Sequence, residues 1–117
     1  TLGDVEGRNA LGPTMVRALE QSLQAAGDDE AVRVVVLGAD GPVFSAGAPR
    51  ALLGQLARGE VRPADILLPR AVLGCPVPVV AAMAGHATGG GFALGLAADV
   101  VLLGAESRYG FPFLDMG

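Results

Sequence analysis

Two short loops of small residues carry the clearest chemical signal in the sequence. They are Phe44–Ala48 (FSAGA) and Thr88–Gly91 (TGGG), and each is expected to follow a short strand and to precede a helix. Such loops leave backbone N–H groups without helical partners. Two N–H groups that converge on one carbonyl oxygen form an oxyanion hole, which stabilises negative charge without a side chain. The alternative is two ordinary turns in which glycine supplies a positive φ, and spacing alone favours that alternative.

Other kinds of catalytic site are mostly excluded by composition. The sequence has one Cys, one His and no Lys, so multi-cysteine and multi-histidine metal centres and a Schiff-base lysine are excluded, and no metal is expected. Cys75 and His86 are poor candidates for a nucleophile–base pair, because Cys75 lies between Gly74 and Pro76 just before a strand. We interpret His86 as a hydrogen-bonded structural histidine. One cysteine also fits a reducing, cytoplasmic compartment.

The distribution of charge bears on possible partners. The formal net charge is −4 over 117 residues, which argues against nucleic acid. Residues 50–70 form the one locally cationic segment, in which four arginines outnumber two acids: Arg50, Arg58, Arg62 and Arg70 against Glu60 and Asp65. That segment is either a solvated helix face or a site for a phosphate group or an acidic partner.

A long uncharged stretch raises the question of a membrane span. Residues 71–98 carry no charge, and these 28 residues are enough to cross a bilayer. Pro76, Pro78 and the glycines at 85 and 89–91 break a helix there. We therefore interpret the stretch as a buried strand, a glycine-rich turn and a buried helix, and expect no membrane partner.

The elements around the two loops predict an α/β fold. Helices are expected at residues 12–27, 50–58, 64–73 and 92–98, and strands at 32–37, 43–44, 77–83 and 100–103, with a glycine-rich turn over Ala84–Gly91. The segment Val32–Leu37 is almost continuously apolar, as a strand covered on both faces would be. The alternation of strands and helices predicts a parallel sheet within one domain over residues 1–117.

Three segments together resemble the crotonase superfamily, which is also called enoyl-CoA hydratase/isomerase. They are VEGRNAL at Val5–Leu11, FSAGA at Phe44–Ala48 and PVVAAMAGHATGGGFALGLAAD at Pro78–Asp99, and the likeness spans nearly all of the chain. The resemblance implies a spiral of ββα units followed by C-terminal helices that assist trimer formation. Members are about twice this length, so we expect the N-terminal core portion here, with the C-terminal helices missing.

The resemblance also assigns roles to individual residues. It places the oxyanion-hole N–H groups on Ala48 and Gly90, where they would hold a thioester oxygen as an enolate. It implies that the backbone of Ala46 contacts the pantetheine arm of the substrate. The other residues expected to line the substrate are Gly89, His86, Leu52 and Phe113. No cofactor is implied beyond the coenzyme A or phosphopantetheine arm that belongs to the substrate.

Two departures from the family pattern bear on the reaction. Hydratases of the family carry two glutamates that position water and move protons, and the matching residues here are Ala93 and Phe113. Neither side chain can transfer a proton. Addition of water by the two-glutamate route is therefore not expected, whereas enolate stabilisation by the backbone is unaffected.

One branch of the superfamily that tolerates this loss consists of the decarboxylases of polyketide β-branching, and the resemblance leaves open a dehydration-associated action in the same process. The segment Gly85–Ser107 resembles that branch, whose substrate is a glutaconyl-type thioester on an acyl carrier protein and whose reaction breaks a carbon–carbon bond. The branch usually carries a tyrosine and a lysine where this sequence has Leu52 and Leu56. Arg50, Arg58 or His86 is the substitute that the sequence offers for those groups.

Two alternatives stay open. The segment Tyr109–Gly117 resembles enoyl-CoA isomerases, in which the catalytic acid would follow residue 117. A catalytically silent crotonase fold that serves as a scaffold is the other alternative. The expected partners are an acyl-CoA or an acyl carrier protein thioester, the carrier protein itself, and further copies of the chain in a homotrimer or a hexamer of trimers.

Overall fold

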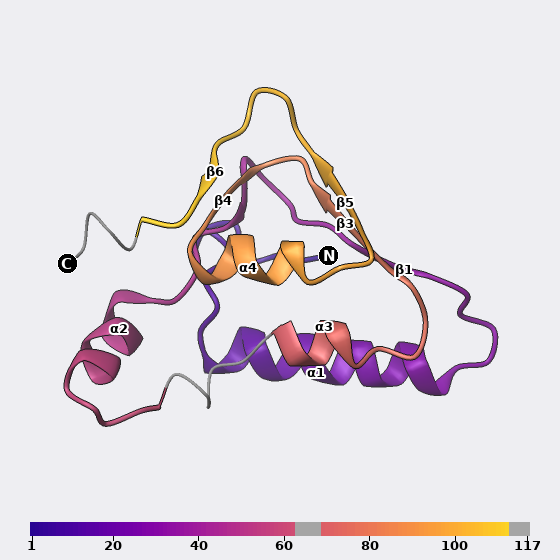
Figure 1. The fold of residues 1–117 in the computed structure, drawn as a ribbon, viewed down its shortest axis with the longest axis horizontal. Helices are drawn as coiled ribbons and strands as arrows, with labels where there is room; N and C mark the ends of the chain where they lie inside the picture. Colours follow the sequence, from indigo (N-terminus) through magenta and orange to yellow (C-terminus); the bar gives the residue numbers. More distant parts are fainter. Residues whose placement is uncertain (63–68, 113–117) are drawn as a thin grey trace.

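Two parallel sheets of three strands each form the framework of the computed structural model, which describes residues 1–62 and 69–112 (Figure 1). The first sheet has the order β1-β3-β5, from Val35–Leu37, Val79–Met83 and Val100–Leu103. The second sheet has the order β2-β4-β6, from Val43–Ser45, His86–Thr88 and Tyr109–Gly110. Every neighbouring pair is parallel, as the sequence predicts.

The chain passes from the first sheet to the second three times. Each passage joins consecutive strands, β1 to β2, β3 to β4 and β5 to β6, and Figure 1 shows the two sheets meeting at an angle with α4 beneath them. Helix α2 (Arg50–Ala57) follows β2, and α4 (Gly90–Leu96) follows β4. Strand–strand–helix units therefore repeat along the chain, and the prediction of a ββα spiral is confirmed.

Helices α1 and α3 lie along the base of the molecule (Figure 1). Helix α1 spans Pro13–Asp28 and begins with proline, whose fixed φ suits the first turn. Its Leu19 and Leu23 are buried in the core. Helix α3 spans Pro69–Leu73, and the earlier part of the helix expected at residues 64–73 lies outside the described residues.

The core lies on one face of the first sheet only. Along β3, Val79, Ala81 and Met83 are fully buried and alternate with half-buried residues, because successive side chains of a strand point to opposite faces. On the other face, Val36 and Val100 are 60% and 49% exposed. The expectation that Val32–Leu37 is covered on both faces is wrong for the described chain, since the helices cover one face.

The stretch expected to be a glycine-rich turn, Ala84–Gly91, contains a strand instead. Strand β4 pairs with β2 and β6, and its central Ala87 is fully buried. A methyl group on Gly85 would lie 2.7 Å from the carbonyl oxygen of Pro42, so this glycine allows close approach between neighbouring segments. The glycine-rich sequence is typical of a turn and therefore did not predict this strand. Strand β6 was not predicted from the sequence either.

The uncharged stretch at residues 71–98 folds into the end of α3, strands β3 and β4, and helix α4. Within the described ranges, no helix combines the length and the apolar character that crossing a membrane requires.

Tyr109 ties the two sheets together, which predicts a measurable loss of stability in Tyr109→Phe. Its hydroxyl donates to the carbonyl oxygen of Met83 and accepts the N–H of Gly104 at 2.7 Å. Removal of the hydroxyl takes this partner from both backbone groups, which still bond each other at 2.9 Å, so the free energy of unfolding should fall by about 0.5–1.5 kcal/mol. Urea denaturation measures the change, and an unchanged midpoint and slope would contradict this role.

Candidate oxyanion site

The two loops that the sequence singles out lie against each other in the structure. Because β2 and β4 are parallel neighbours, the loops that follow them leave the sheet at the same edge. The Thr88 hydroxyl donates to the Ala46 carbonyl oxygen at 3.3 Å. Gly47 has a φ of +77°, and a Cβ there would lie 3.2 Å from the Gly90 nitrogen. The first loop therefore touches the start of α4 directly.

The direction of the Ala48 N–H follows from a hydrogen bond on the other side of its peptide plane. The N–H of Leu11 donates to the Gly47 carbonyl oxygen at 2.8 Å. In a planar trans peptide the carbonyl and the N–H point in opposite directions, so the Ala48 N–H points away from the Leu11 amide. Among the described residues it has no hydrogen-bond acceptor.

The same reasoning fixes the Gly90 N–H. The carbonyl oxygen of Gly89 accepts the N–H of Ala93 at 3.0 Å along α4. The Gly90 N–H of that peptide plane therefore points out of the start of the helix. Gly90 is the first residue of α4, so its N–H has no acceptor within the helix, and no other described group accepts this hydrogen.

The amides of Ala48 and Gly90 lie close to each other. A methyl group built on Gly90 would lie 3.9 Å from the Ala48 nitrogen and 3.8 Å from Cδ1 of Leu11. Among the described residues, nothing else lies within 4 Å of that position apart from the glycine, its two neighbours in the chain and the backbone of the first turns of α4. Leu11 is almost fully buried and forms an apolar wall there. This arrangement can accept one oxygen atom from a ligand that comes close to the backbone.

Two further residues of the predicted site have their amides already engaged. The Ala46 N–H donates to the carbonyl oxygen of Arg8 at 3.0 Å, and the Gly89 N–H donates to that of Gly110 at 2.9 Å. Neither amide is free for a ligand, although both residues adjoin the space beside the Ala48 and Gly90 amides. Contact of Ala46 with a pantetheine arm stays a prediction.

Leu52 lines a pocket of about 330 Å³ between α1 and α2. Its lining is mostly apolar and consists of Leu11, Pro13, Val16, Arg17, Leu52, Gln55 and Val61. Since Leu11 belongs both to this pocket and to the wall beside Gly90, the pocket adjoins that space.

His86 and Phe113 are not brought to that space by the described residues. His86 is exposed at the opposite end of β4 from Gly89, and its Nδ1 accepts the N–H of Arg108 at 2.9 Å. Its interpretation as a hydrogen-bonded histidine is thereby confirmed, while a contact with substrate stays a prediction. Phe113 lies outside the described residues.

Three of the four arginines in residues 50–70 have different surroundings in the structure. Arg58 pairs with Glu60 at 2.6 Å, so much of its charge is compensated. Arg70 is on α3 and lines a different pocket together with Glu20 of α1. Arg50 begins α2, two residues after Ala48, and is exposed. Of the four arginines, Arg50 is therefore the one that adjoins the loops in sequence.

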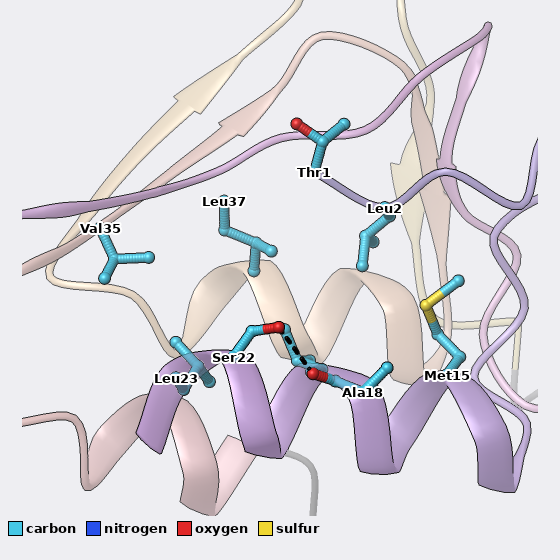
Figure 2. Close-up of a pocket in the computed structure, with 9 residues that line it drawn as sticks. Thr1, Leu2, Met15, Ala18, Ser22, Leu23, Val35 and Leu37 are labelled. Carbon is cyan, nitrogen blue, oxygen red and sulfur yellow. Dashed lines mark hydrogen bonds between the residues drawn. The ribbon is translucent and has the colours of Figure 1, made fainter. Parts of the chain in front are cut away.

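A second pocket lies between α1 and β1 and is unrelated to the loops. Its volume is about 130 Å³. Figure 2 shows side chains from both elements, among them Leu37 and Leu23, around it. The Ser22 hydroxyl at its edge donates to the Ala18 carbonyl oxygen at 2.8 Å within α1. The pocket is a gap in the packing of apolar side chains.

Three residues that support the loops were missed by sequence reasoning. They are Leu11, Asn9 and Ser45, and each is almost fully buried. The Asn9 Nδ2 donates to the Val43 carbonyl oxygen at 2.8 Å, and the Ser45 hydroxyl donates to the Asn9 carbonyl oxygen at 2.8 Å. The one available signal was Ser45, a polar residue within the apolar segment Val43–Ala48, whereas Asn9 follows the charged Glu6 and Arg8 and does not stand out.

Comparison with known proteins places this geometry in a family. The sequence profile of the family "Enoyl-CoA hydratase/isomerase" matches residues 1–117. A putative enoyl-CoA hydratase of Thermus thermophilus is 39% identical over 122 residues, which cover 99% of this chain and 48% of the relative. The bacillaene synthase decarboxylase PksI of Bacillus subtilis is 33% identical over 110 residues, which cover 94% and 44%.

Solved structures agree with the sequence comparison. The ECH2 decarboxylase domain of CurF from Lyngbya majuscula superposes with a TM-score of 0.88 at 37% identity, covering 97% of this chain and 46% of that structure. A structure from a dehydratase/decarboxylase couple involved in polyketide β-branching gives a TM-score of 0.92 at 32% identity, with 97% and 46% covered. The chain thus spans less than half the length of these relatives. It has the crotonase fold and belongs to the enoyl-CoA hydratase/isomerase family.

Proposed function

We propose that the full-length protein stabilises a thioester enolate between the N–H groups of Ala48 and Gly90 and uses it to decarboxylate a glutaconyl-type thioester. The observation that carries the proposal is the pair of unpartnered N–H groups on two loops that lie close together. Two fixed donors aimed at a developing oxyanion stabilise it more strongly than water does, because they need no reorganisation during the reaction.

Decarboxylation suits a site that lacks catalytic glutamates. The bond between the carboxylate carbon and its neighbour breaks, CO₂ leaves, and the electron pair spreads through the conjugated system onto the thioester oxygen. An acid then protonates the resulting dienolate on carbon. Because loss of CO₂ forms the enolate directly, no base is required at Ala93 or Phe113, whose side chains cannot transfer protons.

The relatives support a thioester substrate and divide on the reaction. PksI and the CurF domain are named decarboxylases, whereas the Thermus relative is named an enoyl-CoA hydratase. Ala93 and Phe113 favour the decarboxylases, since the two-glutamate route to hydration is absent. The proposal is therefore a carbon–carbon lyase.

The pocket beside Leu11 is suited to the acyl group of such a substrate. Its apolar lining fits a branched carbon chain, and Arg17 is the only cation among the described residues that line it. A guanidinium can hold a carboxylate through two hydrogen bonds. Arg17 therefore joins Arg50 as a candidate partner for the substrate carboxylate, in a site where Leu52 offers no polar group.

The proposal also covers the carrier of the acyl group and the oligomeric state of the protein. The acyl group would be carried by coenzyme A or by the phosphopantetheine arm of an acyl carrier protein, which would pass beside Ala46. Arg50, exposed at the start of α2, would meet the acidic surface of a carrier protein. The full-length protein would assemble as a homotrimer or a hexamer of trimers in the cytoplasm.

The alternative function is isomerisation of a 3-enoyl thioester to a 2-enoyl thioester. It is favoured by the segment Tyr109–Gly117 and requires an acid after residue 117. It uses the same two N–H groups, so the reaction product separates it from decarboxylation. A catalytically silent scaffold would form neither product.

Incubation with a 3-methylglutaconyl thioester of an acyl carrier protein tests the reaction. The full-length protein should release CO₂ and leave a thioester that is lighter by roughly 44 mass units, because one CO₂ departs as the enolate forms. Mass spectrometry of the carrier measures the product. Migration of the double bond in a 3-enoyl thioester, without CO₂ release, would establish the isomerase, and absence of both reactions would support the scaffold.

Gly90→Ala should abolish most activity without weakening the fold. The added methyl meets only ordinary contacts, at 3.8 and 3.9 Å, and alanine favours a helix. The methyl would nevertheless stand next to the Ala48 amide, where the proposed oxyanion binds. The rate constant kcat should fall by about a hundredfold or more, while the melting temperature should not fall.

Gly38→Ala is the matched control, because nothing lies within 4 Å of its added methyl. It should retain the wild-type rate. Full activity of Gly90→Ala would show that the space between Ala48 and Gly90 does not hold the reacting oxygen.

Arg17→Met should weaken binding of carboxylated substrates selectively. Loss of a charged hydrogen-bond donor should raise KM for the glutaconyl-type thioester by about tenfold or more. Binding of an uncharged acyl thioester of the same length should not change. Arg33→Met, which removes an exposed arginine elsewhere, serves as the control; equal effects on both thioesters would contradict a role in carboxylate binding.

A further inference from the structure

Ser45 is a buried polar residue that no catalytic step uses. It ends β2, and its side chain is completely inaccessible to solvent. Its hydroxyl donates to the Asn9 carbonyl oxygen at 2.8 Å and accepts the Gly47 N–H at 3.2 Å. The single donor of the hydroxyl and one of its two acceptor sites are thus used, which fixes its orientation.

The bond to Gly47 acts on the peptide plane that precedes the free Ala48 amide. Gly47 has a φ of +77°, a conformation that glycine adopts without steric strain. Its N–H is held by Ser45 at 3.2 Å and its carbonyl oxygen by Leu11 at 2.8 Å. With both ends held, the torsion angles of Gly47 are restricted, and so is the direction of the Ala48 N–H.

Ser45 also lies directly against the other loop. A Cβ on Gly91 would come within 2.6 Å of the Cβ, the carbonyl oxygen and the hydroxyl oxygen of Ser45. The backbone of Gly91 therefore packs onto Ser45 with no space for a side chain. Because Gly90 directly precedes Gly91, the position of Ser45 limits how the Gly90 N–H can move relative to the first loop.

We infer that Ser45 is a positioning residue that sets the separation and orientation of the Ala48 and Gly90 amides, an inference that rests on the proposed function. It acts through Gly47 on one side and through the backbone of Gly91 on the other. Its connection to Asn9 extends the support, since the Asn9 side chain holds the Val43 carbonyl oxygen at 2.8 Å. Ser45 does not touch the substrate in this scheme.

The experiment compares the full-length wild type with Ser45→Ala and Ser45→Cys. Alanine removes the hydroxyl, and cysteine keeps its bulk with a weaker donor. Ser107→Ala is the matched control, because the Ser107 hydroxyl also donates to a backbone carbonyl, that of Ala84 at 2.8 Å, away from the loops. Two readouts are used: kcat and KM for the 3-methylglutaconyl thioester, and the absorbance of the enolate of bound acetoacetyl-CoA as pH is varied.

A positioning role predicts a loss in kcat rather than in binding. In Ser45→Ala, kcat should fall by between about tenfold and a hundredfold, as for small misplacements of a catalytic group, with KM within about twofold of wild type. Acetoacetyl-CoA bound to the wild type should ionise at lower pH than in solution. In Ser45→Ala that titration should move back up by about one pH unit, the equivalent of a tenfold loss.

Ser45→Cys should fall between the wild type and Ser45→Ala, and Ser107→Ala should match the wild type. If Ser45→Ala does not fold, Ser45→Cys carries the test, and wild-type kcat and titration in that variant overturn the inference. Wild-type values in a folded Ser45→Ala overturn it as well. A wild type that neither releases CO₂ nor shifts the acetoacetyl-CoA titration refutes the proposed function instead, so the two failures are distinguishable.

Discussion

The rigidity of the peptide plane is the constraint on which the candidate site depends. A backbone N–H cannot be turned independently of the carbonyl group in the same plane. In the planes that end at Ala48 and Gly90, the carbonyl oxygens are bound by Leu11 and Ala93, at 2.8 and 3.0 Å. Hydrogen bonds made on the far side of each plane therefore set the direction of both N–H groups, and the proposed function requires the two to meet at one oxygen.

Parallel strands supply the second part of the arrangement. Because β2 and β4 pair in parallel, both loops leave the second sheet at one edge, although 42 residues separate the bonded pair Ala46 and Thr88. The glycines of these loops have different functions. Gly47 and Gly91 are required for close contact, since a Cβ at either would lie 2.6–2.7 Å from another residue. At Gly90 a methyl fits the fold and would fill only the space left for a ligand.

Much of this fold was predictable from the sequence, because Val79–Met83 and the helix after Pro13 have the expected composition and periodicity. The strand at His86–Thr88 was not, since its pairing with β2 and β6 outweighs the turn preference of glycine-rich residues around it. For the site, the resemblance to crotonases selected Ala48 and Gly90, which local spacing did not. The contributions of Ser45 and Leu11 depend on contacts between distant segments and have no local signature.

A crystal structure of the full-length protein with a non-reactive thioester analogue would locate the thioester oxygen. We predict that this oxygen lies about 2.7–3.1 Å from the nitrogen atoms of both Ala48 and Gly90, with the acyl chain against Leu11. A thioester oxygen bound elsewhere, or water retained between the two amides in the presence of the analogue, would contradict it.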